Sequence, residues 1–544
     1  MMAAPHRTPI IARVIPGIFL IIVVFTASVG ARESVWTHSA GDAANSGVAR
    51  RAPADLGTVA WSATPETAPG LLEQFVWRGG VVTAGNRVFI TGRRYFDDGS
   101  GIVEHTDNIV ICFDGANGER LWDTLIDADS FGYDSWSTPV LDLSHQTIIV
   151  ASHFTLFALD METGDLVWER ELPQVLVNAS PTVSSGLTSH GVPADRVFMT
   201  DYTGFASTGG GIYAINVSPF DSEANPYEQG EIVWQDRSLP GTSGNTVAYA
   251  DGFVYVASTH GGVIRCYRAV DGGTDGILGE HEWETDTGVS KLAQFAGFYG
   301  GLTVNSDHVY VAAYTFYGVG NSSRMYKLRS DDGELVWEIP CERTDSIPVV
   351  TDDGRIYLSA GIDGFGSAVK IQAFQDQGKF ATQLWDSFVD TSGELIVGGW
   401  THQPIVADGM LFCGTPDNAQ FFAPYTDLYI LDTSFYPGHP DFIVDNATGG
   451  GGSPAVLDRF VYTLGSAGLV AYRGCGGADM NNDGESELID FAAWELCMSG
   501  PQEDTQPANC ETHAFRCADL DGDGDVDMQD FGMFEHAFES DMNP

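Results

Sequence analysis

The segments CFDGANGERLW (residues 112–122), ALDMETGDLVW (158–168) and KLRSDDGELVW (327–337) are three copies of one pattern. Each copy begins with a short strand-like run, turns at a glycine and ends at a tryptophan. Gly164 and Gly333 stand where a tight hairpin needs a residue with positive φ, which glycine adopts without strain. The pattern therefore predicts two antiparallel strands joined by a turn.

Weaker copies of this pattern run through the rest of the chain. They end at Trp234, Trp283, Trp385 and, with phenylalanine at the position of the tryptophan, at Phe442. A strand start marked by proline or glycine, such as SPTV at Ser180, leads into an alternating strand such as RVFMT at Arg196. Every unit is thus predicted to hold four short antiparallel strands, with its tryptophan buried against a neighbouring unit.

The two ends of the repeat region complement each other. Residues 460–474 (FVYTLGSAGLVAYRG) lack a tryptophan strand, whereas residues 56–63 (LGTVAWSA) form a tryptophan strand without its predecessors. An N-terminal strand that completes the last unit would remove the free sheet edge. We therefore predict an all-β, eight-bladed β-propeller closed by the strand around Trp61, or seven blades if one weak copy is an insertion.

The repeat resembles that of the PQQ-repeat (quinoprotein-like) β-propellers over about residues 55–474. That family includes quinone-dependent alcohol dehydrogenases and non-enzymatic propellers similar to the outer-membrane assembly lipoprotein. In the dehydrogenases, the resemblance implies a disulfide between adjacent cysteines over the quinone, a calcium-bound carboxylate set in the channel and often a haem module. The chain has no adjacent cysteines and no CxxCH, so we expect neither bound pyrroloquinoline quinone (PQQ) nor the redox activity.

Charge and the N-terminus indicate where the protein works. The chain carries 26 Lys and Arg against 74 Asp and Glu, a net charge of −48, which argues against nucleic acid as a partner. Arg7 and Arg13 precede the apolar run 14–27, and small residues follow it, as in a signal peptide. We expect a signal peptide at 1–31, a linker at 32–54 and an exported protein, periplasmic, on the cell surface or extracellular. It would have no stable membrane insertion after cleavage, an uncleaved anchor being the alternative.

After residue 474 the composition changes to an acidic segment with four cysteines. Cys475, Cys497, Cys510 and Cys517 suggest two disulfides in a small exported module at 475–544, with three possible connectivities. The remaining cysteines are scattered through the propeller and are expected to be buried.

Two stretches of this segment have the spacing of twelve-residue calcium loops. Such a loop binds one ion with oxygens from positions 1, 3, 5 and 12 and the carbonyl at position 7, and a glycine at position 6 permits the turn. The sequence therefore predicts two calcium ions. The first loop would use Asp479, Asn481, Asp483, Glu485 (carbonyl) and Asp490, and the second Asp519, Asp521, Asp523, Asp525 (carbonyl) and Asp530.

An Asp at position 12, where an EF-hand has Glu, and a helix only after each loop resemble the dockerin type of duplicated calcium module. In that family calcium folds the module and a helix face docks onto a cohesin. Positions 10 and 11 are Leu488-Ile489 and Met528-Gln529, without the hydroxyl pair common in cohesin-binding dockerins. Calcium binding is thus a firmer expectation than a cohesin-like partner.

Searches for catalytic motifs identify no candidate catalytic residues. The chain contains no H-E-x-x-H, G-x-S-x-G or G-x-G-x-x-G. The aromatic stretches 295–299 and 314–317 suit either blade packing or a face that binds a protein or glycan. We favour a non-enzymatic scaffold or binding protein with a calcium-dependent module for protein attachment; the alternative is a secreted enzyme, either PQQ-dependent or acting on polysaccharide.

Overall fold

A computed structural model gives the structure of residues 35–542. Within this range it leaves out 69–70, 77, 98–102, 128–134, 136, 204–208, 273–278, 294, 317–319, 363–366, 388–394, 418–422, 458, 476–477, 481–486, 504, 511 and 521–523. The predicted signal peptide, residues 1–31, lies outside the described residues.

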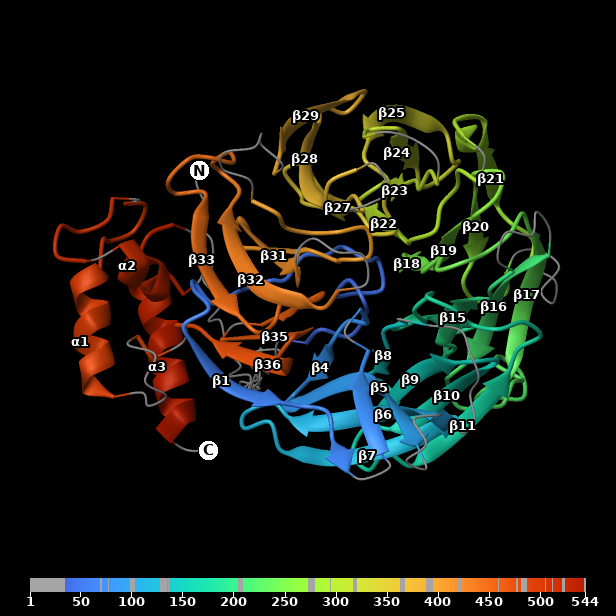
Figure 1. The fold of residues 1–544 in the computed structure, drawn as a ribbon, viewed down its shortest axis with the longest axis horizontal. Helices are drawn as coiled ribbons and strands as arrows, with labels where there is room; N and C mark the ends of the chain where they lie inside the picture. The colour runs from blue at the N-terminus through green and yellow to red at the C-terminus, as the bar shows by residue number, and fades with distance from the viewer. Residues whose placement is uncertain are drawn as a thin grey trace, which may run out of the picture. The chain divides into compact units, whose positions relative to one another are not determined.

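The repeats form eight antiparallel sheets, which confirms the eight-bladed propeller. Each blade has four main strands, and the tryptophan strand is the outermost in Figure 1. Blades 1 to 4 consist of β4 (Val82–Ala84), β5 (Arg87–Asp97), β6 (Val103–Asp114) and β7 (Arg120–Asp127); β8 (Val140–Asp142), β9 (Thr147–Ser152), β10 (Thr155–Asp160) and β11 (Leu166–Glu171); β12 (Thr182–Val183), β15 (Arg196–Thr200), β16 (Gly210–Asn216) and β17 (Ile232–Leu239); and β18 (Ala248–Ala250), β19 (Phe253–Ala257), β20 (Val263–Arg268) and β21 (Trp283–Asp286).

The second half of the ring repeats this arrangement. Blades 5 to 8 consist of β22 (Leu302–Asn305), β23 (His308–Ala312), β24 (Ser323–Arg329) and β25 (Leu335–Cys341); β26 (Val349–Val350), β27 (Arg355–Ala360), β28 (Lys370–Asp376) and β29 (Ala381–Asp386); β30 (Ile405–Ala407), β31 (Met410–Pro416), β32 (Tyr425–Asp432) and β33 (Ile443–Thr448); and β34 (Ala455–Val456), β35 (Phe460–Gly465), β36 (Gly468–Arg473) and β1 (Thr58–Ala63). Additional elements are β2 (Thr67–Ala68) and β3 (Leu71–Phe75) on blade 1, the hairpin of β13 (Thr188–Ser189) and β14 (Val192–Pro193), and a 3₁₀ turn at Val289–Lys291.

The repeat tryptophan joins a blade to the next one in the blades that carry it, which excludes blade 7. The indole N–H of Trp122 donates to the carbonyl of Met161 in the next hairpin (3.3 Å), and Gly164 of that hairpin has φ of 76°. A Cβ on Gly164 would lie 2.7 Å from the indole, so glycine is needed for both backbone and space. The same contact joins Gly118 to Trp61, Gly230 to Trp168, Gly272 to Trp234 and Gly333 to Trp283. Each buried indole contributes about 4–6 kcal/mol of gross burial energy, at about 25 cal/mol per Å².

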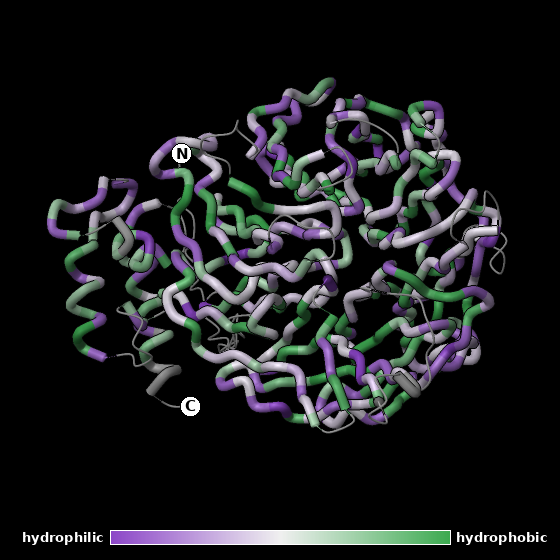
Figure 2. The backbone as a smooth tube through the Cα atoms, viewed as in Figure 1, coloured by the Kyte–Doolittle hydropathy of each residue, from purple (hydrophilic) through white to green (hydrophobic). Residues whose placement is uncertain are grey.

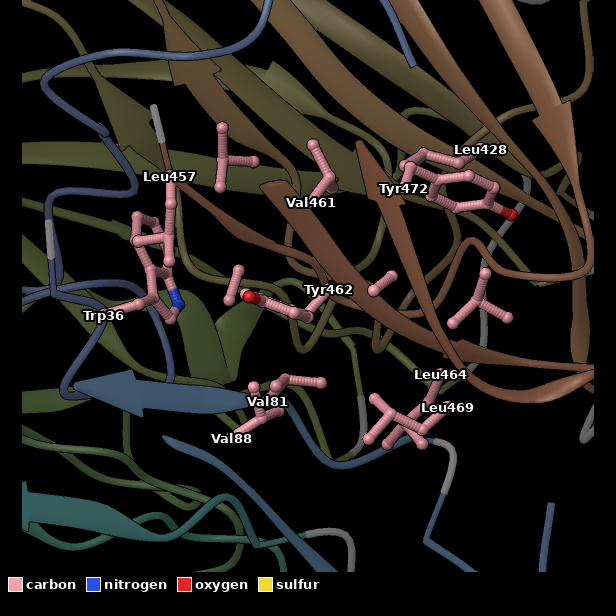
Figure 3. Close-up of a cluster of buried hydrophobic side chains, with 14 of the residues drawn as sticks. Trp36, Val81, Val88, Leu428, Leu457, Val461, Tyr462, Leu464, Leu469 and Tyr472 are labelled. Atoms are coloured by element: carbon pink, nitrogen blue, oxygen red, sulfur yellow. The ribbon is translucent and has the colours of Figure 1, made fainter. Parts of the chain in front are cut away.

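The propeller closes as the sequence predicts. Trp61 of β1 pairs with Ala471 of β36, and Ser62 pairs with Val470. Buried side chains from both ends of the chain form one cluster at this closure, among them Trp36, Leu457 and Tyr462 in Figure 3. Figure 2 shows that hydrophobic segments run along the strands of the ring.

The segment expected to be a linker, 32–54, differs from that expectation over its described part. From residue 36 to 49 it follows the inner strands and bonds to them in blade order. The backbone contacts are Trp36–Thr83, Thr37–Leu141, Ala43–Tyr249, Ala44–Val304, Gly47–Val406 and Ala49–Val406, and the His38 ring bonds to the backbone of Val183. The segment thus covers the inner strands of the propeller as an integral part of it.

In blade 7 the predicted position of Phe442, as the residue that replaces the repeat tryptophan, is wrong. The strand register pairs Asp445, not Phe442, with the position that faces a tryptophan in the other blades: Ile430 lies opposite Asp445, as Ala158 lies opposite Trp168. Phe442 instead lies in the hairpin and packs against Trp385 of blade 6, with ring centroids 5.4 Å apart. The long insertion hides this register, because the position of the hairpin turn cannot be read from sequence.

Three helices follow the propeller: α1 (Leu488–Cys497), α2 (Thr512–Ala518) and α3 (Met528–Met542). They surround a small core of their own, centred on Trp494 and Phe534. Among the described residues, none of the helices is both long and apolar enough to cross a bilayer.

Candidate functional site

The two predicted calcium loops close in the same way. In the first, the buried carboxylate of Asp490 accepts backbone N–H bonds from Met480 and Glu487, both at 2.9 Å. In the second, the buried carboxylate of Asp530 accepts them from Leu520 (2.6 Å) and Asp527 (2.7 Å). Positions 2 and 9 therefore bond to position 12 in both loops. This shared geometry supports the reading of the segment as a duplicated loop.

The described loop residues bring further oxygens together near Asp530. A carboxylate oxygen from each of Asp525, Asp527 and Asp530 lies within 4.8 Å of the others. We predicted Asp525 as a carbonyl ligand and did not predict Asp527. Asp527 occupies position 9, which calcium loops use often through water, and that rule would have identified it. Asn481, Asp483, Glu485, Asp521 and Asp523 lie outside the described residues.

The first loop differs from the second at its first residue. Asp479 is buried, and its Oδ2 lies 2.8 Å from Nη2 of Arg473 and 3.2 Å from Nη2 of Arg459, both from blade 8. In the second loop, Oδ2 of Asp519 accepts the N–H of Gly524 (3.0 Å). The position-1 carboxylate of the first loop therefore already faces two positive charges.

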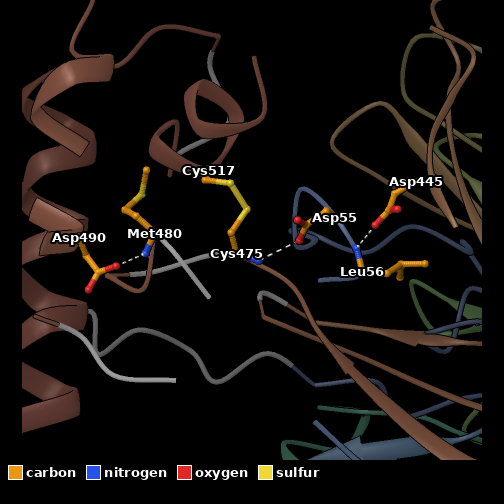
Figure 4. Close-up of a disulfide and its surroundings, with 7 residues drawn as sticks. All are labelled: Asp55, Leu56, Asp445, Cys475, Met480, Asp490 and Cys517. Atoms are coloured by element: carbon orange, nitrogen blue, oxygen red, sulfur yellow. Dashed lines mark hydrogen bonds between the residues drawn. A yellow bond between two sulfur atoms is a disulfide. The ribbon is translucent and has the colours of Figure 1, made fainter. Parts of the chain in front are cut away.

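The module begins at the seam of the propeller, shown in Figure 4. Asp55 accepts the N–H of Cys475 (3.1 Å), and Asp445 accepts that of Leu56 (2.8 Å). In the other blades a hairpin turn connects the third strand to the outermost strand. In blade 8 these two strands, β36 and β1, come from opposite ends of the propeller sequence, so no turn connects them. Asp445, at the tryptophan position of blade 7, thus binds the entering N-terminal strand in place of a turn.

Two disulfides hold the module together, as expected from its four cysteines. Cys475 pairs with Cys517 and Cys497 with Cys510, which selects one of the three possible connectivities. The indole N–H of Trp494 donates to the carbonyl of Ala518 (3.0 Å) and so joins α1 to α2. A core this small gains substantially from such cross-links.

One face of α1 remains apolar and exposed. Leu488 and Ile489, at positions 10 and 11 of the first loop, are 77% and 62% exposed, and Leu496 is 55% exposed. Met528, at position 10 of the second loop, is 67% exposed. Exposed large apolar side chains at equivalent positions are typical of a protein-binding face.

A cavity of about 70 Å³ lies at the centre of the propeller. Residues that precede the inner strands of all eight blades line it, among them Arg78, Tyr299 and Asp345. The predicted aromatic stretches lie beside it: Tyr299 and Tyr314 form a cluster with Phe316 and Trp400. Burial raises the pKa of Asp345 well above its ordinary value, and the positive charge of Arg78 lowers it in part.

The described lining of this cavity offers few groups of the kind that the resemblance implies around the quinone of the dehydrogenases. Asp345 is the one carboxylate among the described lining residues, whereas the resemblance implies a calcium-bound carboxylate set. The cavity is also small, since sites for cofactor-sized ligands occupy about 300–1,000 Å³.

Comparison with known proteins agrees with the repeat. Residues 106–218 match the family model "Outer membrane protein assembly factor BamB". No curated protein sequence matches the chain significantly. The quinohemoprotein alcohol dehydrogenase from Comamonas testosteroni is 13% identical, with 81% of this chain and 78% of that chain covered and a TM-score of 0.52. The quinohemoprotein alcohol dehydrogenase ADHIIG from Pseudomonas putida HK5 is 11% identical, with 80% of this chain and 76% of that chain covered and a TM-score of 0.51.

BamB from Moraxella catarrhalis is 15% identical, with 75% of this chain and 96% of that chain covered and a TM-score of 0.46. At these identities the likeness to the two dehydrogenases concerns the fold alone. The chain therefore has the fold of a PQQ-type β-propeller, with residues 106–218 similar to the BamB family, followed by a small helical C-terminal module.

Proposed function

We propose that the chain is an exported, non-enzymatic β-propeller scaffold whose C-terminal segment is a dockerin-like, calcium-dependent module that attaches it to another protein. The observation that carries this proposal is the identical closure of both loops on buried Asp490 and Asp530. A buried carboxylate held by two backbone N–H groups is fixed in place, as a ligand at position 12 must be.

Calcium would supply charge compensation in each loop. Asp519, Asp525, Asp527 and Asp530 would hold it in the second loop with Asp521 and Asp523, and Asp479 and Asp490 would hold it in the first with Asn481, Asp483 and Glu485. Extracellular calcium modules work in the range of about 10⁻⁴–10⁻³ M. An exported protein would meet such concentrations, and the net charge of −48 favours cation binding.

The attachment face in this proposal is the exposed apolar surface of α1, formed by Leu488, Ile489 and Leu496. Because positions 10 and 11 are apolar in the first loop, the partner should offer a largely apolar face rather than hydroxyl-binding groups. A cohesin-like fold is one form of such a partner.

The proposal is tested by calcium titration of the full chain by calorimetry. Asp530→Asn should weaken binding at the second loop at least tenfold, and Asp490→Asn should do so at the first. Glu535→Gln, an exposed residue of α3, makes the same change of charge and should leave binding unaltered. Absence of calcium binding up to about 10 mM, or binding that neither Asp variant alters, would overturn the proposal.

A further inference from the structure

The wall of the central cavity carries hydroxyl groups that can still donate hydrogen bonds. In three neighbouring blades, a side-chain oxygen at one equivalent position accepts a backbone N–H bond from the preceding blade. These bonds run from Gly80 to Thr138 (2.7 Å), from Thr138 to Ser180 (3.0 Å) and from Ser180 to Thr246 (3.0 Å). A hydroxyl group that accepts through a lone pair keeps its proton for a second bond. None of these three hydroxyls donates to another group in the described part of the chain, so they offer three donors to a ligand.

The same wall holds two buried side-chain oxygens that have no hydrogen-bond partner among the described residues. They are Oγ of Ser39, on the N-terminal segment, and Oδ1 of Asn178, which precedes the inner strand of blade 3. A buried polar atom without a partner costs free energy, and such atoms are usually retained where solvent or a ligand pairs with them. These two oxygens need donors, whereas the three hydroxyls need acceptors.

The backbone holds Asn178 in a conformation that few residues adopt. Its φ is 66°, in the left-handed region that L-residues other than glycine rarely populate, although asparagine tolerates it better than most. The N–H of Asn178 donates to Oγ of Ser135 (3.1 Å), which fixes the backbone there. A glycine would adopt this φ without strain, so the backbone does not require the asparagine side chain. Strained residues of this kind concentrate at ligand sites, and the amide of Asn178 faces such a role here.

The cavity favours a ligand without charge. Asp345 is the one acidic side chain in the described lining, and burial favours its uncharged form, which can both donate and accept a hydrogen bond. Oδ1 of Asp345 also has no hydrogen-bond partner among the described residues. Arg78 is engaged within the protein, where its guanidinium lies 5.8 Å from the ring centroid of Trp400. An ionic ligand would therefore lose its hydration at such a site without gaining an opposite charge.

We infer that this cavity binds neighbouring hydroxyl groups of a neutral polyol, carried either by a small free polyol or by the last sugar of a glycan. Each hydroxyl of such a ligand both donates and accepts. Its protons would pair with the oxygens of Ser39 and Asn178, and its oxygens would accept from the three wall hydroxyls. A ligand with donors alone or acceptors alone would leave part of the wall unpaired.

The size of the cavity agrees with this class of ligand. One water needs about 10–15 Å³ by the same measure, so about 70 Å³ offers about five to seven such positions. Glycerol has about six non-hydrogen atoms and fits entirely, whereas a hexose has about twelve. Because the cavity is half open to solvent, a sugar ring can insert one edge and leave the rest of the glycan outside. Tyr299 and Ile347 add apolar surface for the C–H groups of either ligand.

The test uses the purified full chain with calorimetry and ligand-observed NMR. Glycerol, erythritol, methyl α-glucoside and maltose are compared with acetate, methylammonium and 1-propanol, each up to about 50 mM, because ligands this small bind in the millimolar range. We expect the polyols or the sugars to bind, and the three other probes to bind at least tenfold more weakly. Preference for the sugars identifies a glycan end, and preference for glycerol or erythritol identifies a free polyol. Binding should not change with salt, because no charge is recognised.

Two variants remove the unpaired oxygens without removing a hydrogen bond that the described fold uses. Ser39→Ala deletes one oxygen, and Asn178→Gly deletes the other while keeping the left-handed backbone. Each should weaken binding at least fivefold, the value of about one hydrogen bond, with an unchanged melting temperature. Matched controls are Ser222→Ala, at an exposed position, and Asn321→Gly, at an exposed position with φ of 55° that does not line the cavity. Both should leave binding unaltered.

Asp345→Asn tests whether the ligand is neutral. Asparagine also donates and accepts without charge, so this variant should keep its affinity within about twofold. A tenfold loss would show that an ionised carboxylate is recognised and would overturn the inference. Absence of binding by every polyol and sugar would also overturn it, since the cavity then holds only water. Tighter binding of acetate, methylammonium or 1-propanol, or unchanged affinity in both Ser39→Ala and Asn178→Gly, would do the same. None of these outcomes depends on the calcium module, so the inference and the proposed function fail separately.

Discussion

The guanidinium of Arg473, the last residue of β36, lies 2.8 Å from the carboxylate of Asp479, the first residue of the first predicted calcium loop. Arg459 of the same blade approaches the same oxygen. One carboxylate thus connects the closing blade to the C-terminal module. Positive charges at this point oppose a cation in the loop.

The two loops should therefore differ in calcium affinity, the second being the tighter. Replacing both Arg459 and Arg473 by Gln should raise the calcium affinity of the first loop by roughly tenfold, or about 1.4 kcal/mol. Without calcium the same variant should lose about 3–5 kcal/mol of stability, because the buried carboxylate of Asp479 loses both of these positively charged partners. Calorimetry and urea unfolding measure the two effects. Arg329→Gln, from an exposed pair, serves as control, and an unchanged first site would contradict the prediction.

The hairpin glycines should not be equally replaceable. Gly164→Ala should cost about 2–4 kcal/mol, since it adds a Cβ 2.7 Å from the indole of Trp122 to the strain of a left-handed backbone. Gly378 also has a positive φ, 83°, but no atom lies within 4 Å of the Cβ that an alanine would add there. Gly378→Ala should therefore lower the stability by only about 1–2 kcal/mol. Guanidinium unfolding gives both values. Equal losses would mean that contact with tryptophan adds nothing.

The two disulfides should stabilise the module and not the propeller. By loop entropy, removing Cys475–Cys517, which are 42 residues apart, should cost about 4 kcal/mol, and removing Cys497–Cys510, 13 apart, about 3 kcal/mol. Hydrogen exchange of α1 and α3 in the paired serine variants measures the loss. Exchange in the propeller is the internal control, because its cysteines are free thiols; faster exchange there would show that both parts unfold together.

Acid should weaken the N-terminal segment through His38. Burial lowers the pKa of His38 to about 4, although Asp42 and Asp142 act in the opposite direction. The stabilisation from the neutral ring is complete above about pH 6.5 and is lost as the pH falls towards 4. At about 1.4 kcal/mol per pKa unit, this loss is roughly 3 kcal/mol. His38→Gln should flatten the pH dependence of unfolding between these values, and His190→Gln, at an exposed turn, should not.

The repeat made most of the propeller predictable. The glycine turn and the tryptophan lie about four residues apart, so local sequence specifies each hairpin, and the unmatched ends of the array specify the closure at Trp61. The spacing of the residues from Asp479 to Asp490 likewise predicted a loop that closes on Asp490, because the hydrogen bonds that close it come from residues within the loop. Phe442 was wrongly predicted to replace the repeat tryptophan of blade 7, because an insertion obscures where the hairpin turn ends and the outermost strand begins.

Other features were decided by the tertiary structure alone. The path of residues 36–49 along the inner strands, the two arginines at Asp479, the pairing of the cysteines and the position of Asp345 beside Arg78 all join residues far apart in the chain. Sequence by itself determined what each segment forms with its neighbours, since hairpins and loops depend on backbone geometry over a few residues. Which distant groups meet depends on the closing of eight sheets around one axis, and no local pattern records it.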